Sequence, residues 1–168
     1  MSVISETAVI QGRRIEPLHT LDYDAGSFRD RDGRVFYHNG EVFRALSAAA
    51  LDDWQAVSVQ PFFQQAMRDG RVVPTQKASP ESVDVGGEWA GLLRHERIPF
   101  VSYPYEWTFS MLRDAGLLQL ALLRDALAAD MILKDATAYN VQWVGSRPTL
   151  IDVSSFRRLR PGELWPGY

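Results

Sequence analysis

The sequence of 168 residues contains no cysteine, and this absence excludes a disulfide framework, a thiolate nucleophile, an iron–sulfur cluster and a cysteine-based zinc site. It also has little excess charge of either sign, because 18 basic and 21 acidic side chains leave a formal net charge of −3. Such a balance produces no broad positive field that would attract nucleic acid or an anionic membrane. We therefore expect neither nucleic acid nor a membrane as a partner.

Long apolar runs are missing as well. The first twenty residues include Glu6 and Arg13 and never form the apolar core of a signal peptide, so we expect a cytoplasmic protein. The longest apolar stretch, 117–123, is flanked by charged residues and is too short to span a bilayer. With 46% hydrophobic residues the chain nevertheless has enough apolar side chains for the core of one globular domain.

The first half of the sequence predicts a small antiparallel sheet with one helix. Residues 35–38 and 41–46 flank the dipeptide Asn39-Gly40, which is typical of a two-residue hairpin because a type I′ turn needs positive φ at both positions. Asp32-Gly33 predicts a second turn, and residues 1–21 are expected to form an extended arm or an opening strand.

A helix is predicted to follow the hairpin, with Ser47 as its N-cap, a pause at Pro61 and a glycine C-cap at Gly70. We expect a short edge strand over 71–75 and a loop over 77–87.

The second half predicts one more strand pair, a long helix and a hairpin. The apolar segments 89–93 and 98–103 suggest antiparallel strands, and apolar periodicity over 108–131 predicts the longest helix. Residues 140–144 and 149–153 then read as a hairpin, with Asp152 on its second strand.

The segment Leu133-Lys134-Asp135-Ala136-Thr137-Ala138-Tyr139-Asn140, followed twelve residues after Asn140 by Asp152, resembles the catalytic segment of the protein-kinase-like superfamily. The resemblance implies an α+β, protein-kinase-like fold, in which a small antiparallel sheet with one helix precedes a long helix, a catalytic-loop hairpin and a truncated C-lobe. Residues 1–103 would form the N-lobe-like part. Residues 104–168 would form a hinge and a partial C-lobe, with a cleft between the two parts.

The same resemblance implies roles for five residues. Asp135 would be the catalytic base, Asn140 and Asp152 would bind Mg²⁺, and Arg44 and Lys134 would contact ATP. Phosphoryl transfer needs a carboxylate beside the attacking hydroxyl and oxygen ligands that hold magnesium against the phosphates of the nucleotide. The implied partner is a nucleotide or a small-molecule substrate.

The sequence also departs from the kinase pattern. The region 24–33 offers only Gly26 and Ser27 toward a phosphate-covering loop, and the third strand carries Arg44 where the family has lysine. The first helix has no glutamate in its middle, and Val153-Ser154 replaces Phe-Gly after the metal-binding aspartate. A complete lower lobe is about a hundred residues longer, so we expect the chain to be the amino-terminal part of a longer protein.

A second resemblance points the same way. Residues 133–142 and 151–156 are similar to the amino-terminal region of bacterial class I SAM-dependent methyltransferases that are related to a nodulation protein. This resemblance implies a non-catalytic accessory module for a downstream methyltransferase domain. The 168 residues themselves show no strand followed by a glycine-rich turn into a helix, so they predict no methyl-donor site.

Plain structural roles remain open for every one of these residues. Asp135 can hydrogen-bond loop backbone, Asn140 can fix a turn and Asp152 can end a strand in an unrelated α+β domain. The three histidines have no ligand spacing, so surface or hydrogen-bonded core positions are expected, and Ser154-Ser155 lacks the setting of a hydrolase triad. The tryptophans and tyrosines are expected to pack in the core and the hinge.

Overall fold

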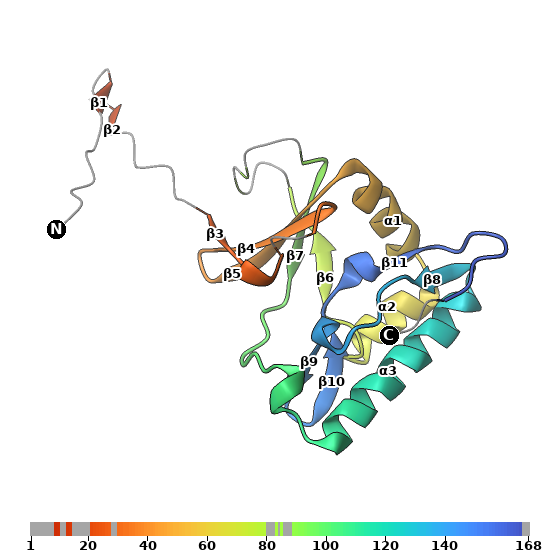
Figure 1. Cartoon of the computed structure of the whole chain (residues 1–168). Coiled ribbons are helices and arrows are strands. Elements are labelled where there is room, and N and C mark those ends of the chain that lie inside the picture. The colour runs from red at the N-terminus through yellow and green to blue at the C-terminus, as the bar shows by residue number, and fades with distance from the viewer. Residues whose placement is uncertain are drawn as a thin grey trace.

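The computed structural model describes residues 9–10, 13–14, 21–27, 30–79, 83, 85 and 89–165, and shows an α+β arrangement of antiparallel strands and three α-helices (Figure 1). The first half contains β1 (Val9–Ile10), β2 (Arg13–Arg14), β3 (Asp22–Tyr23), η1 (Ala25–Ser27), β4 (Gly33–His38), β5 (Glu41–Leu46), α1 (Ala48–Ser58), α2 (Pro61–Arg68), β6 (Thr75–Lys77) and β7 (Gly91–His95). The second half contains η3 (Pro104–Glu106), α3 (Phe109–Leu127), β8 (Met131–Leu133), η4 (Ala138–Asn140), β9 (Val141–Val144), β10 (Arg147–Leu150), η5 (Val153–Ser155) and β11 (Phe156–Arg158).

Five strands form one sheet in the order β3-β4-β5-β7-β6, and each neighbouring pair is antiparallel. The predicted hairpin is confirmed, because Asn39 (φ 51°) and Gly40 (φ 79°) both have positive φ between β4 and β5. Asp32, part of the predicted second turn, lies in a bend directly before β4, which begins at Gly33, and β3, β4 and β5 form an antiparallel meander. Most of the predicted opening arm lies outside the described residues, which there include the pair β1–β2 and Leu21.

Two helices, α1 and α2, follow β5, where the sequence predicts a single helix interrupted at Pro61. The Oγ atom of Ser47 accepts a hydrogen bond of 3.2 Å from the backbone N–H of Ala50, which confirms the predicted N-cap of α1. Pro61 begins α2 because proline lacks the N–H that the first turn leaves unpaired. Gly70 (φ +73°) lies two residues beyond the end of α2, as predicted.

The strand pair predicted for 89–93 and 98–103 is wrong. The strand β7 instead pairs with β5 on one side and β6 on the other, and 98–103 contains no strand. Pro99 lacks the N–H that a ladder requires. The predicted edge strand at 71–75 lies further along, at β6, while Val72 makes an isolated parallel bridge to Leu150. Only part of the predicted loop 77–87 lies within the described residues.

The long helix α3 is confirmed but ends at Leu127, four residues earlier than predicted. The chain then turns at Asp130 (φ 54°) and continues as β8, which pairs with β11. Neither β8 nor β11 was predicted as a strand. Asp152 does not lie on the second strand of the hairpin, as expected, but follows β10 and directly precedes η5.

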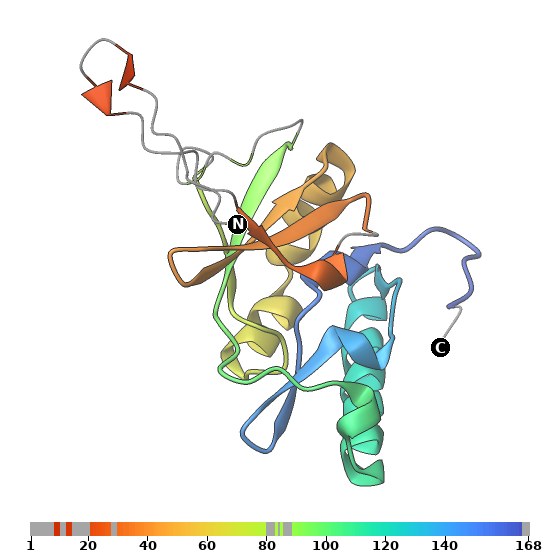
Figure 2. The ribbon, with the colours of Figure 1, turned by 60° about the vertical axis from the view of Figure 1, so that its left-hand side comes forward.

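The main core lies between the sheet, the helices and the strands of the second half (Figure 2). Leu46 and Leu93 from the sheet pack in the same buried cluster as Leu122 from α3 and Phe156 from β11. A smaller cluster around Phe36 and its neighbours covers the other face of the sheet. Within the described ranges, no helix combines the length and the apolar character needed to cross a lipid bilayer.

Candidate functional site

An ion pair between the two halves of the chain is the centre of the candidate site. Arg44 lies on β5, the third strand of the five-stranded sheet counted from β3, and its Nη1 atom is 2.7 Å from Oδ1 of Asp152. Only 8% of Arg44 is exposed. A guanidinium in such a place needs a compensating anion, because an unpaired charge is expensive to bury. The segment after β10 supplies that anion.

Two serine hydroxyl groups complete the surroundings of Asp152. Ser154 Oγ donates to Oδ1 of Asp152 at 2.6 Å and accepts from Arg44 Nη1 at 2.7 Å. Ser155 Oγ donates to Oδ2 of the same carboxylate and accepts from the Nδ2 group of Asn140 at 3.3 Å. Asn140 is thereby linked to Asp152 through one hydroxyl group. The short η5 turn makes this possible because it folds both serines back toward Asp152.

These contacts determine the charge state of Asp152. Burial alone raises a carboxyl pKa, but the positive charge of Arg44 and the hydrogen bonds from Ser154 and Ser155 outweigh it and hold the pKa of Asp152 below its ordinary value. The carboxylate is therefore ionised at neutral pH, as both an ion pair and a metal ligand require.

Asp135 and Lys134 lie on the loop after β8. Oδ1 of Asp135 accepts a hydrogen bond of 3.1 Å from the backbone N–H of Thr137, which is the loop-stabilising contact that a plain structural role predicts. The Nζ atom of Lys134 is 3.8 Å from Oδ2 of Asp53, a residue of α1. Asp53, one of the two carboxylates of α1, thus pairs with Lys134, while Arg44 on the third strand pairs with Asp152.

A buried histidine lies close to the ion pair. The hydroxyl group of Thr75 lies 2.9 Å from the carbonyl oxygen of Val73 and 2.8 Å from Nδ1 of His95, and is hydrogen-bonded to both. The Nε2 atom of His95 is buried and has no hydrogen-bond partner in the described part of the chain. Burial and the charge of Arg44 lower the pKa of His95 to about 3, with Asp152 acting in the opposite direction.

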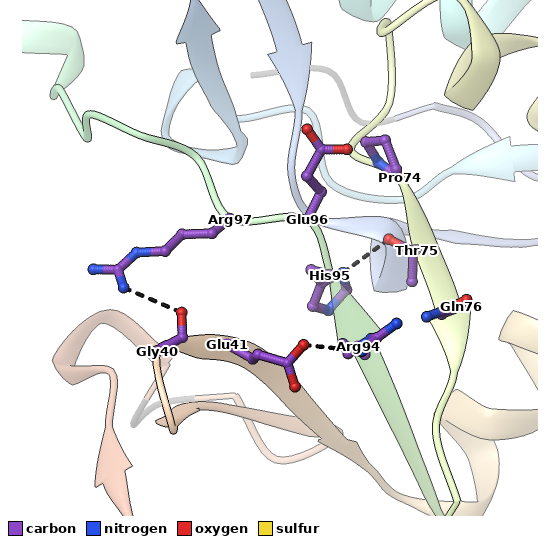
Figure 3. A pocket seen from close by; sticks show the side chains of 9 residues that line it. All are labelled: Gly40, Glu41, Pro74, Thr75, Gln76, Arg94, His95, Glu96 and Arg97. Carbon is purple, nitrogen blue, oxygen red and sulfur yellow. Dashed lines mark hydrogen bonds and ion pairs between the residues drawn. The ribbon is translucent and has the colours of Figure 1, made fainter.

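A cavity of about 470 Å³ lies at the end of the sheet beside the β4–β5 turn (Figure 3). Its lining combines Glu41, Arg94 and Arg97 with the buried His95, and Arg94 is already paired with Glu41 at 2.9 Å. The cavity is not lined by Asp135, Asn140 or Asp152, so it differs from the cleft that the sequence predicted between the two parts.

The structure brings three of the five predicted residues together and leaves Lys134 and Asp135 outside that network. Arg44, Asp152 and Asn140 belong to one hydrogen-bonded network, and Lys134 is held by α1. The sequence analysis did not identify Ser155 as the link between Asn140 and Asp152, because a serine beside a second serine carries no signal for such a contact. His95 was expected at the surface or in a hydrogen-bonded core position, and the second alternative is confirmed.

No family model matches the chain. A curated relative is nodulation protein NoeA from Rhizobium meliloti (strain 1021), which is 40% identical over 145 residues. The match covers 86% of this chain but only 30% of NoeA, so the chain spans less than a third of the length of that relative.

Proposed function

We propose that the chain is a kinase-like domain that binds a magnesium–nucleotide complex at Arg44, Asn140 and Asp152. The single observation that carries the proposal is the contact of 2.7 Å between Arg44 on the third strand and Asp152, 108 residues later. The sequence resemblance implies a phosphate contact for Arg44 and a metal contact for Asp152, and these two side chains touch.

The donor set fits magnesium. Mg²⁺ prefers oxygen ligands and usually binds one or two carboxylates, with water and substrate phosphates completing its coordination. Asp152 offers an ionised carboxylate and Asn140 an amide oxygen, since its Nδ2 group is the one that faces Ser155. The described residues contain no group of three or more acidic, histidine or cysteine side chains that could hold a metal alone. The metal would therefore arrive with the nucleotide.

The roles of the chain's own residues follow from their contacts. Arg44 would exchange part of its contact with Asp152 for a phosphate oxygen, which a guanidinium can do while remaining hydrogen-bonded to Ser154. Asp135 would accept the proton of an attacking hydroxyl group if phosphoryl transfer occurs. The hydrogen bond from Thr137 holds that carboxylate at a fixed orientation.

The test is calorimetric titration of the chain with ATP, with and without magnesium chloride. We expect saturable binding that depends on magnesium and weakens at least tenfold in Asp152→Asn and in Asn140→Ala. The matched control is Asp130→Asn, which makes the same chemical change at an exposed position whose positive φ suits asparagine. Absence of binding at millimolar nucleotide would contradict the proposal, as would equal loss in the control.

A second candidate function is a non-catalytic module that serves a downstream methyltransferase domain. It is favoured by one observation: both oxygens of Asp152 already accept hydrogen bonds from within the chain, as in a purely structural pair. In that case Asp135→Ala changes stability only, and every titration with nucleotide stays flat in the wild-type chain and the variant. A magnesium-dependent isotherm in the wild-type chain would contradict this candidate.

A further inference from the structure

The cavity at the end of the five-stranded sheet is built from three separate segments of the chain. The β4–β5 turn contributes 40–41, the chain at the start of β6 contributes 74–76, and the end of β7 contributes 94–97. The volume of about 470 Å³ lies within the roughly 300–1,000 Å³ of small-molecule sites. Because Asn140 and Asp152 do not line it, the cavity is separate from the proposed nucleotide site.

Hydrogen bonds hold the three segments of the cavity together. The Nη1 atom of Arg97 donates to the carbonyl oxygen of Gly40 at 3.1 Å, and the backbone N–H of Glu96 donates to the carbonyl oxygen of Pro74 at 2.8 Å. The walls are therefore fixed before a ligand arrives, which reduces the entropy that binding costs.

One buried polar atom in the wall of the cavity has no partner in the described part of the chain. His95 lines the cavity and is only 8% exposed, and its Nε2 atom makes no hydrogen bond there. Figure 3 shows the imidazole in the middle of the lining residues, with Thr75 on one side and Arg97 and Gly40 on the other. Since a buried polar atom without a partner is destabilising, a ligand group that bonds to Nε2 gains affinity.

The charged side chains of the wall are balanced in sign. Glu41 and Arg94 form an ion pair of 2.9 Å and neutralise each other. Glu96 and Arg97 also line the cavity, and neither has an ion-pair partner among the described residues. A ligand with several negative charges would be repelled by the two carboxylates, and a cationic ligand would be repelled by the two guanidinium groups. The wall therefore favours a ligand that is polar but uncharged.

We propose that this cavity binds a sugar, a neutral polyhydroxylated ligand of monosaccharide size. A hydroxyl group both donates and accepts, so the hydroxyl groups of one sugar can donate to the carboxylate of Glu96 and accept from the guanidinium of Arg97. The Nε2 atom of a neutral imidazole is either a donor or an acceptor, and a hydroxyl group suits both forms of His95. An uncharged polyol thus satisfies all three groups at once.

Calorimetric titration of the whole chain with glucose, mannose and galactose tests the proposal. We expect at least one of the three sugars to bind saturably, with a dissociation constant that rises at least tenfold in Arg97→Gln and in Glu96→Gln, because each variant removes a hydrogen bond to a charged group. Both side chains are exposed, so the fold tolerates these changes. The matched control Arg113→Gln makes the same change on α3, outside the cavity, and leaves the dissociation constant unchanged.

Nuclear magnetic resonance of the histidine ring nitrogens measures the contact with His95 directly. The Nε2 signal of His95 should shift with sugar concentration along the same saturation curve as the calorimetric heat. In His95→Asn the shorter side chain keeps a polar atom near the position of Nδ1, beside Thr75, but removes Nε2. Sugar binding should therefore weaken in this variant, and circular dichroism of the same sample verifies that it is folded.

Three results would each overturn the proposal. They are the absence of saturable binding for all three sugars, an affinity that Arg97→Gln and Glu96→Gln leave unchanged, and an Nε2 signal that stays fixed during the titration. The last result would show that only an internal water bonds to His95. Asn140→Ala separates this site from the proposed nucleotide site, because it should weaken the binding of magnesium–ATP and leave the affinity for sugar unchanged.

Discussion

At the scale of single residues, the surroundings of Arg44 show how two polar side chains can be buried together. Asp152 and Ser154 satisfy one nitrogen of the guanidinium, while the buried Nε of Arg44 and the Nε2 of His95 have no partner in the described part of the chain. Arg44 and His95 lie on the same face of adjacent strands, at diagonal positions of the register. The neutral form of His95 adds no second positive charge beside Arg44.

The depressed pKa of His95 predicts how stability depends on pH. The folded protein keeps His95 neutral down to about pH 3, whereas the unfolded chain binds a proton below about 6.5, so stability is complete above 6.5 and falls as the pH decreases. Between pH 7 and pH 5 the wild-type chain should lose about 2 kcal/mol more than His95→Gln. Urea unfolding at both pH values measures the difference, and equal losses in the two proteins would refute the assignment.

At the scale of elements, helix boundaries depend on single hydrogen bonds. Ser47 caps α1 through Ala50 and also donates to Asp32 at 3.2 Å. Ser47→Ala should therefore lower the free energy of unfolding by about 1 kcal/mol, while Ser47→Asp retains an acceptor and costs less. Chemical denaturation of the two variants compares them directly. A loss that is the same for alanine and aspartate would show that the cap contributes nothing.

Local chemistry explains which elements could be predicted. The Asn39-Gly40 turn, the Ser47 cap and the apolar periodicity of α3 act within a few residues, and all three predictions are confirmed. The strands β8 and β11 pair although they are more than twenty residues apart in the sequence. Each has only three residues, which is too short for a recognisable strand pattern in the sequence. The strand predicted at 98–103 is absent. Apolar residues alone do not make a strand, because a strand also needs a neighbouring strand with free backbone groups, and β7 already pairs with β5 and β6.

The residues of the candidate site also fall into two kinds, those that the sequence could indicate and those that it could not. The spacing of Asp135, Asn140 and Asp152 in the sequence points to these three residues, and the place of Arg44 on the third strand points to Arg44. The structure places Arg44 and Asp152 in contact. Ser155 and Thr75 could not have been found, because a hydroxyl group gains its role only from a partner that folding brings near. Nucleotide binding by these residues stays a prediction, which the calorimetric titration with ATP tests.

At the scale of the whole molecule, the main core joins residues on both sides of position 103. Leu46, Val57 and Leu93 share this core with Leu122 and Phe156. A fragment of residues 1–103 loses the second half of that core, so it should not unfold cooperatively, and its far-ultraviolet circular dichroism should lack a sigmoidal transition. A cooperative transition in the fragment would instead show that the predicted N-lobe-like part folds by itself.

The long separation between Arg44 and Asp152 also has a consequence for synthesis in the cell. A ribosome that adds roughly 5–20 residues per second needs about 5–20 s to make the 108 residues between them. During that interval β4 and β5 can pair, since their hairpin is local, but the apolar face that includes Leu46 has neither α3 nor β11 to cover it. The nascent chain is therefore most exposed to aggregation, and most in need of a chaperone, before residue 152 leaves the ribosome.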